Sequence, residues 1–165
     1  MNSESTSQER SFLTGVFFGT GSGVITTLGL IVGLFAGTES IAAVMGGILV
    51  IAVSDSMSDA FGIHLSEESR PDSTQRGVWV ATGATFVTKF MMAVTFVVPL
   101  LILPLDQAVV ACLIWGIVVL SVLSVFIARQ QQLAPWGVIT EHLSIAALVM
   151  VLSWLVGVGV NRLFD

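Results

Sequence analysis

Two aspartates, Asp55 and Asp59, lie inside an apolar stretch of the chain. Their four-residue spacing places both side chains on one face of a helix, one turn apart. Carboxylates are hard oxygen ligands that suit Mn²⁺, Fe²⁺ or Mg²⁺. Two like charges at this spacing also repel, so they can share a proton that a bound metal ion would displace. The pair therefore predicts a cation site that is coupled to proton release.

Other residues able to carry a charge or a proton also fall in apolar segments. Lys89 could neutralise one aspartate while the other is protonated, which is the alternative of a buried ion pair. Glu141 is either an acid at the mouth of a cation pathway or an interfacial acid that reaches water, and the adjacent His142 is a metal ligand, a proton relay or an interfacial residue. Because ionised side chains cost several kcal/mol in lipid, an excess of acids over Lys89 favours a cation or proton pathway. The expected metal ligands are Asp55, Asp59 and Glu141.

A stripe of small residues marks one face of the first apolar segment. Its members fall within about 80° of one another at 100° per residue: Gly15, Gly19, Ser22, Thr26, Gly29, Gly33 and Gly37. Small residues let helices approach closely in lipid. The stripe is consistent with packing inside the chain, with a dimer seam or with the wall of a pathway. In the last case Ser22 and Thr26 would contribute hydroxyl groups to cation passage or proton coupling.

The elements that must position these residues follow from the gaps between charges. A membrane-spanning helix needs about 20 mostly apolar residues. Suitable segments are residues 12–37, 41–63, 78–103, 107–128 and 136–160. They are long and continuous and lack the alternation of barrel strands. The sequence thus predicts an all-α integral membrane protein with a single transmembrane domain over residues 1–165.

Composition excludes several classes of protein. Hydrophobic residues make up 55% of the chain and charged residues only 10%, which is too apolar for a soluble enzyme. Six Lys and Arg against eleven Asp and Glu give a net charge of -5, so no basic surface is available for a nucleic acid. No cofactor fingerprint or nucleophile–base pair is recognisable. We expect neither an enzyme nor a bound cofactor.

The arginines predict an orientation in the bilayer. Arg10, Arg70, Arg76 and Arg129 flank the predicted helices on one side, and Arg162 lies on the other. Positively charged residues favour the cytoplasmic side. We therefore expect a cytoplasmic N-terminus and an external C-terminus.

Three short runs resemble the vacuolar iron transporter family, which includes yeast vacuolar iron and manganese carriers and plant nodulin-like proteins. Gly23–Thr27 is similar to the family's first-span Gly-Ile/Leu-x-Thr-Thr/Pro pattern, which an Asp precedes. Ser54–Ser66 resembles its second-span Ala-Asp-Ala-x-Ser-Met-Gly-x-Gly-Glu-Tyr-Leu-Ser pattern, and Ile139–Leu143 resembles Gly-Leu-Glu-x-Leu in its fifth span. By position, Asp55 matches the second-span Asp and Glu141 the fifth-span Glu.

The chain departs from that pattern in three places. Ser22 stands where the family has its first-span Asp, and Asp59 stands where it has a Met. The family's long cytoplasmic insert between the second and third spans is reduced to residues 66–77. Within this short connection, Glu67 and Glu68 either collect cations at the entrance or form a solvated face. The resemblance thus implies a short member in which an acid has moved from the first helix to the second.

The resemblance implies a function as well as a fold. It implies a homodimeric transporter in the lipid bilayer that moves Fe²⁺ or Mn²⁺ out of the cytoplasm in exchange for protons. The small size and missing insert favour a prokaryotic inner membrane. Two alternatives are a non-transporting scaffold or accessory protein of the same fold, and a transporter of another small cation.

Overall fold

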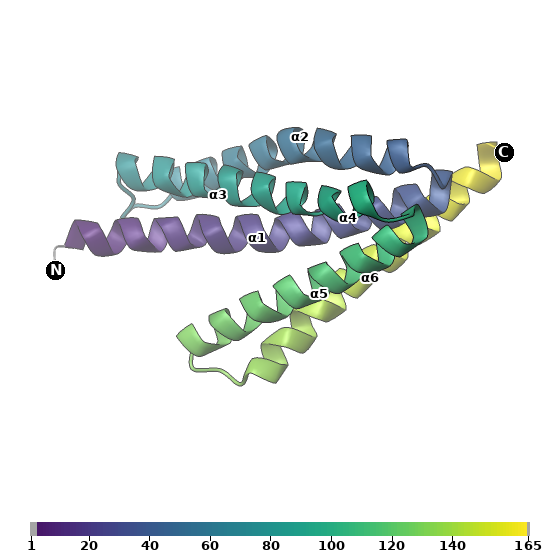
Figure 1. Ribbon diagram of the computed structural model, residues 1–165. Coiled ribbons are helices and arrows are strands. Elements are labelled where there is room, and N and C mark those ends of the chain that lie inside the picture. The colour runs from purple at the N-terminus through teal and green to yellow at the C-terminus, as the bar shows by residue number, and fades with distance from the viewer. Residues whose placement is uncertain (1–2, 165) are drawn as a thin grey trace.

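The structure, a computed structural model, describes the backbone of residues 3–164 and the side chains of residues 8–164. The described chain is a bundle of helices without strands (Figure 1). The helices are α1 (Ser3–Thr38), α2 (Ile41–Glu68), α3 (Gln75–Thr95), α4 (Val97–Ile102), α5 (Leu105–Gln130) and α6 (Pro135–Phe164). With α3 and α4 taken together, 5 segments are long and apolar enough to cross a membrane. The predicted all-α membrane fold is therefore confirmed.

Local side-chain chemistry sets several helix ends. The Ser40 side chain accepts a hydrogen bond from the backbone N–H of Ala43 at 3.3 Å and begins α2. Thr74 caps α3 in the same way, through the N–H of Gly77 at 3.1 Å. Pro135 begins α6, where its missing N–H costs no helical hydrogen bond.

The third apolar run is broken between α3 and α4, which the sequence analysis did not predict. The break falls at Phe96, whose N–H bonds to the carbonyl of Ala93, one residue short of the regular helical partner. Pro99 explains the position, because a proline has no N–H to give the carbonyl four residues earlier and its ring clashes there. The run remains one span, Gln75–Ile102.

Helix α1 lies at the centre of the bundle and contacts α2, α3, α5 and α6. In Figure 1, α2 and α3 lie along α1, whereas the α5–α6 hairpin crosses it at an angle. The hairpin is close to α1 near the C-terminal end of α1 and diverges toward the other end. In the diverging half the rings of Phe17 and Phe126 bridge α1 and α5, with centroids 5.8 Å apart.

The connections alternate between the two ends of the bundle. The N-terminus, the α2–α3 connection and the α5–α6 connection share one end, called here the N-terminal side (Figure 1). The C-terminus and the other connections lie at the opposite end. Large apolar side chains such as Phe61, Ile114 and Val156 are exposed on α2, α5 and α6. Exposed apolar side chains of this kind are typical of membrane-spanning helices.

The small-residue stripe of α1 packs inside the chain. A Cβ on Gly15 would lie 2.5 Å from the carbonyl oxygen of Ala81 on α3, and one on Gly33 would lie 3.2 Å from that of Ser153 on α6. The contact is reciprocal, since a Cβ on Gly157 would lie 2.2 Å from the carbonyl oxygen of Gly33. These glycines thus bring α3 and α6 against α1. The homodimer, with this stripe at or beside its seam, stays a prediction.

Candidate intramembrane ion site

Helices α2 and α3 bring three charged side chains together inside the bundle. The ammonium group of Lys89 lies 2.6 Å from Asp55 Oδ2 and also contacts Asp59 Oδ2. The Lys89 side chain is 2% exposed, whereas those of Asp55 and Asp59 are 31% and 23% exposed. Gly23 on α1 makes room for the lysine, because a Cβ there would lie 3.3 Å from Lys89 Cγ. We call Asp55, Asp59 and Lys89 the ion triad.

Ser22 on α1 bonds to two members of the ion triad. Its hydroxyl group donates to Asp59 Oδ2 at 2.6 Å and accepts from Lys89 Nζ at 3.0 Å. Lys89 thus donates hydrogen bonds to Asp59 and Ser22, and its ammonium group pairs with Asp55 through their opposite charges. Thr26, one turn further along α1, instead donates to the carbonyl of Ser22 at 2.9 Å and does not bond to the triad.

The triad has two acidic groups and one basic group. When both carboxylates are ionised, it carries an excess negative charge in an apolar segment. Such a charge is costly in a bilayer unless a proton or another cation neutralises it. The side chains of both aspartates are partly exposed, whereas that of Lys89 is buried.

Glu141 and His142 do not join the triad. Glu141 is exposed on α6, and His142 Nδ1 lies 2.8 Å from the hydroxyl oxygen of Ser124 on α5. No three His, Cys, Asp or Glu side chains converge into a metal-binding group among residues 8–164. The structure thus brings together Asp55 and Asp59, with Ser22 and Lys89, and leaves Glu141 apart from the other expected metal ligands.

A cavity of about 300 Å³ separates α1 from the α5–α6 hairpin in the diverging half of the bundle. Ser22 and His142 both line it, together with apolar side chains such as Phe17 and Leu123. We call it the Ser22–His142 cavity. Because Ser22 also bonds to Asp59 and Lys89, this cavity adjoins the ion triad.

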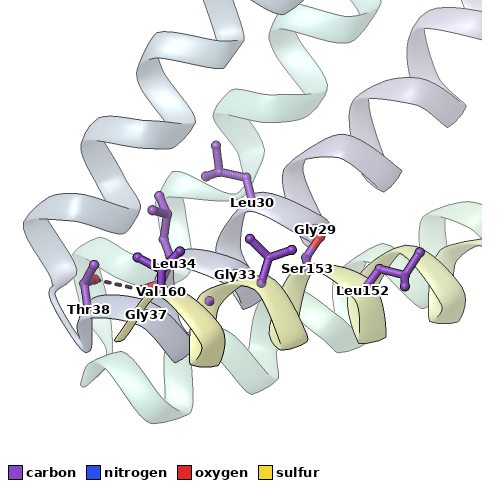
Figure 2. A pocket seen from close by; sticks show the side chains of 11 residues that line it. Gly29, Leu30, Gly33, Leu34, Gly37, Thr38, Leu152, Ser153 and Val160 are labelled. Atoms are coloured by element: carbon purple, nitrogen blue, oxygen red, sulfur yellow. Dashed lines mark hydrogen bonds between the residues drawn. The ribbon is translucent and has the colours of Figure 1, made fainter. Parts of the chain in front are cut away.

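A second cavity, of about 480 Å³, lies between α1 and α6 on the opposite half. Figure 2 shows Gly29, Gly33 and Gly37 along its α1 side, with Leu152 among the α6 side chains. Its lining contains no charged residue, and the Thr38 hydroxyl donates to its own helix, to the carbonyl of Leu34 at 2.7 Å. The groove is thus mostly apolar, with the hydroxyl groups of Thr38 and Ser153 among its lining side chains.

Glu67 corrects the expectation of a solvated acidic pair. Because α2 continues to Glu68, Glu67 lies on the last turn of a helix and is 4% exposed, whereas Glu68 is exposed. Its carboxylate accepts from the Ser11 hydroxyl and from Arg70, each at 3.0 Å. The hydrogen bond and the charge of Glu67 raise the pKa of Arg70. Glu67 therefore joins α1 to the α2–α3 connection and is not free to collect cations.

Two further buried polar groups are not among the residues that the sequence singles out. The hydroxyl groups of Thr27 and Ser56 are buried and have no hydrogen-bond partner within the described part of the chain. Ser56 follows Asp55 on α2, and Thr27 lies one helical turn beyond Gly23 on α1. Their spacing offered no pattern to recognise, since a lone hydroxyl in an apolar helix usually bonds to its own backbone.

No family model, characterised protein or solved structure matches the chain. The class of protein is therefore defined by the fold: an integral membrane protein with 5 spanning segments. Within those segments it holds two aspartates on one lysine. The resemblance to the vacuolar iron transporter family stays a prediction.

Proposed function

We propose that the protein is a transporter that exchanges a cation for protons across the membrane. The observation that supports this function is the ion triad, in which two carboxylates, of Asp55 and Asp59, share the single ammonium group of Lys89. A chain that needed only stability would gain by replacing such a cluster with well-packed apolar residues. The free-energy cost of placing these charges in an apolar segment is explained if the carboxylates bind a mobile cation.

A divalent metal ion fits the charges of this site. In the resting state, a charged Lys89 with one ionised and one protonated aspartate is neutral. With a divalent ion bound, the site is neutral again when both carboxylates are ionised and Lys89 has lost its proton. One metal ion thus replaces two protons, one from the carboxyl group and one from the ammonium group. Fe²⁺ and Mn²⁺ suit such oxygen ligands, and the resemblance of Ser54–Ser66 to the iron carriers supports the same ions.

Further features of the proposal come from the sequence. The arginine bias supports a cytoplasmic N-terminus, and export from the cytoplasm through a homodimer in a prokaryotic inner membrane follows the family resemblance. On this orientation Glu141 lies about 9 Å into α6 from Pro135, at 1.5 Å per residue, on the cytoplasmic half. It serves there as an acid at the pathway's mouth and not as a ligand in the triad.

One observation favours a second candidate function. Lys89 pairs with both aspartates and donates a hydrogen bond to Ser22, so contacts within the chain link α1, α2 and α3 without a metal ion. These contacts suit a non-transporting scaffold or accessory protein in which the ion triad fastens the three helices together. In a transporter, removal of the carboxylates should abolish cation flux. In a scaffold, their removal should weaken the fold.

Reconstituted liposomes test the proposal. A metal-sensitive dye and a pH-sensitive dye inside the vesicles would report uptake of Fe²⁺, Mn²⁺ or a monovalent cation, with and without a pH gradient. We expect metal uptake coupled to proton movement in the wild type and none in the double variant Asp55→Asn, Asp59→Asn. The matched control is Asp106→Asn, because Asp106 is exposed in the first turn of α5.

Each outcome is decisive. Flux in the double variant equal to that of Asp106→Asn would remove the carboxylates from the mechanism. A folded wild type without flux for any tested cation would favour the scaffold. If the vesicles take up only the monovalent cation, the protein is a transporter whose substrate is monovalent and not divalent.

A further inference from the structure

His142 lies beside a hydroxyl group of its neighbour on α5. Its Nδ1 lies 2.8 Å from Ser124 Oγ, and Ser124 Oγ lies 2.6 Å from the carbonyl oxygen of Leu120 on its own helix. A hydroxyl group has one proton. When the carbonyl of Leu120 takes that proton, Ser124 accepts from His142 and Nδ1 carries the hydrogen. The other ring nitrogen, Nε2, is then left as a proton acceptor.

The chain contains two histidines, and the other one has the same arrangement. His64 Nδ1 on α2 lies 3.0 Å from the Thr82 hydroxyl, which donates to the carbonyl of Val78 at 2.7 Å. The edge of its ring meets Trp79, with centroids 4.8 Å apart. His64 provides a control of the same local chemistry.

The two histidines differ in what surrounds them. His142 lines the Ser22–His142 cavity, whereas His64 lies between α2 and α3 and does not line it. The other described residues that line the cavity, from α1 and α5, are apolar, glycine or Ser22, so none of them is titratable. On its own helix, the adjacent charged group is the exposed Glu141. His142 thus shares this cavity with Ser22, which bonds to Asp59 and Lys89 of the ion triad.

We propose that His142 is the proton-transfer residue between the ion triad and the N-terminal side of the membrane. This inference rests on the proposed cation–proton exchange. A proton that leaves Asp59 or Lys89 passes through water in the cavity, beside the Ser22 hydroxyl, to Nε2 and gives an imidazolium ion. The imidazolium returns that proton from Nε2 to water on the N-terminal side, and the ring regains its starting tautomer. Ser22 and His142 supply the polar groups that water in an apolar cavity requires.

The variant His142→Gln tests the transfer, with His64→Gln as matched control. Glutamine keeps a donor for the neighbouring hydroxyl group but cannot accept and release a proton. Proton transfer by a positioned side chain contributes roughly 100-fold or more to a rate. Through a water-containing cavity we expect a smaller loss of pH-gradient-driven metal uptake in His142→Gln, about tenfold. Exchange of internal for external metal, which needs no net proton release, should stay within about twofold of the wild type.

A spectroscopic measurement keeps the inference testable if a variant folds poorly. In ¹⁵N-histidine-labelled protein in lipid nanodiscs, wild-type His142 should show a hydrogen on Nδ1 and a bare Nε2 at high pH. Ser124→Ala should release the ring to both tautomers. A wild-type ring with its hydrogen on Nε2 would overturn the proposal.

The flux results separate the two proposals. If His142→Gln and His64→Gln retain equal pH-driven uptake, the transfer role of His142 fails and the exchanger remains. If the wild type moves no cation at all, the exchanger fails and the proton path fails with it.

Discussion

Ser22 on α1 and Asp59 on α2 are joined by a hydrogen bond of 2.6 Å, although 37 residues separate them in the sequence. The same hydroxyl group accepts from Lys89 on α3. One small side chain therefore connects three helices at the ion triad. Serine at this position supplies a neutral acceptor, whereas an acid there would add a third acidic group to a cluster that has one basic group.

Replacing Ser22 with alanine should weaken the bundle modestly. The change removes both hydrogen bonds and leaves Asp59 with Lys89 alone. Hydrogen bonds between membrane helices average about 0.6 kcal/mol and reach about 1.7 kcal/mol, so we expect a loss of about 1 kcal/mol in unfolding free energy. Thr26→Val is the control, because its hydroxyl bonds only to its own helix. Thermal unfolding in detergent would measure both, and equal losses would contradict the role of Ser22.

The packing of α6 on α1 depends on Gly157. An added Cβ at this position would lie 2.2 Å from the carbonyl oxygen of Gly33, and backbone atoms cannot move aside cheaply. We expect Gly157→Ala to cost about 1–3 kcal/mol of stability, the usual range for overpacking. Gly159→Ala, two residues along the same helix, meets nothing within 4 Å and should be neutral or slightly stabilising. A Gly157→Ala protein as stable as Gly159→Ala would show that α6 packs elsewhere.

The membrane architecture could be predicted from the sequence because it depends on single-residue properties. Long gaps between charges are enough to find helices that cross a bilayer, and the structure has them. Their ends were less predictable. Helix α2 runs five residues beyond Ile63 to Glu68, because its polar last turn forms helix outside the apolar run. Because of that extension, Glu67 lies on α2 and not in the connection that the sequence predicts.

The candidate site was predictable only in part. The four-residue spacing of Asp55 and Asp59 was enough to place them on one face, and both indeed meet Lys89. Spacing along one helix says nothing about which turn of another helix lies opposite. The bond from Ser22 and the separation of Glu141 depend on how α1 and α6 cross, and a sequence pattern does not define that crossing.

Glu67 should contribute to stability in a way that its neighbour does not. Its removal leaves the buried Ser11 hydroxyl without its acceptor, which costs about 1–3 kcal/mol. Arg70 is 46% exposed, so the ion pair itself adds little. We expect Glu67→Ala to lower the melting temperature and the exposed Glu68→Ala to change stability by less than about 0.5 kcal/mol. Two equal, small effects would show that the Ser11 contact is not needed.

The pH dependence of the Glu67–Arg70 pair follows from the direction of the shift. Glu67 raises the pKa of Arg70, so the stabilisation that Arg70 supplies is complete below its ordinary value and is lost only as the pH rises through the raised one. That window lies far above neutral pH. A titration of unfolding between pH 6 and about 9 should therefore show no loss from Arg70.

The orientation of the protein can be tested at two exposed positions. Asp72 lies in the α2–α3 connection, and Leu163 lies at the end of α6, on the opposite side of the bundle. If the arginine bias holds, a membrane-impermeant thiol reagent applied from outside should label Leu163→Cys and miss Asp72→Cys. Cys112 is buried and supplies a low background. The reverse pattern would show that the protein has the opposite orientation in the membrane. Equal labelling of both sites would indicate dual orientation.

Lys89 should be the most sensitive residue in the chain. Replacing it with methionine keeps much of the side-chain volume but leaves Asp55 and Asp59 facing each other without a cation. Breaking a buried ion pair costs about 3–5 kcal/mol of unfolding free energy. Because both carboxylates are partly exposed, we expect a loss at the lower end of this range, about 3 kcal/mol. Thermal unfolding of Lys89→Met in detergent would measure this loss.

The matched control neutralises the whole ion triad. In the triple variant Asp55→Asn, Asp59→Asn, Lys89→Met no charge is left unpaired, so stability should recover toward that of the wild type while cation flux stays absent. Such a result would mean that the carboxylates are retained for the ion they meet and not for the fold. If the triple variant is instead as unstable as Lys89→Met, the hydrogen-bonded triad itself holds α1, α2 and α3 together, and the scaffold becomes the better account of the protein.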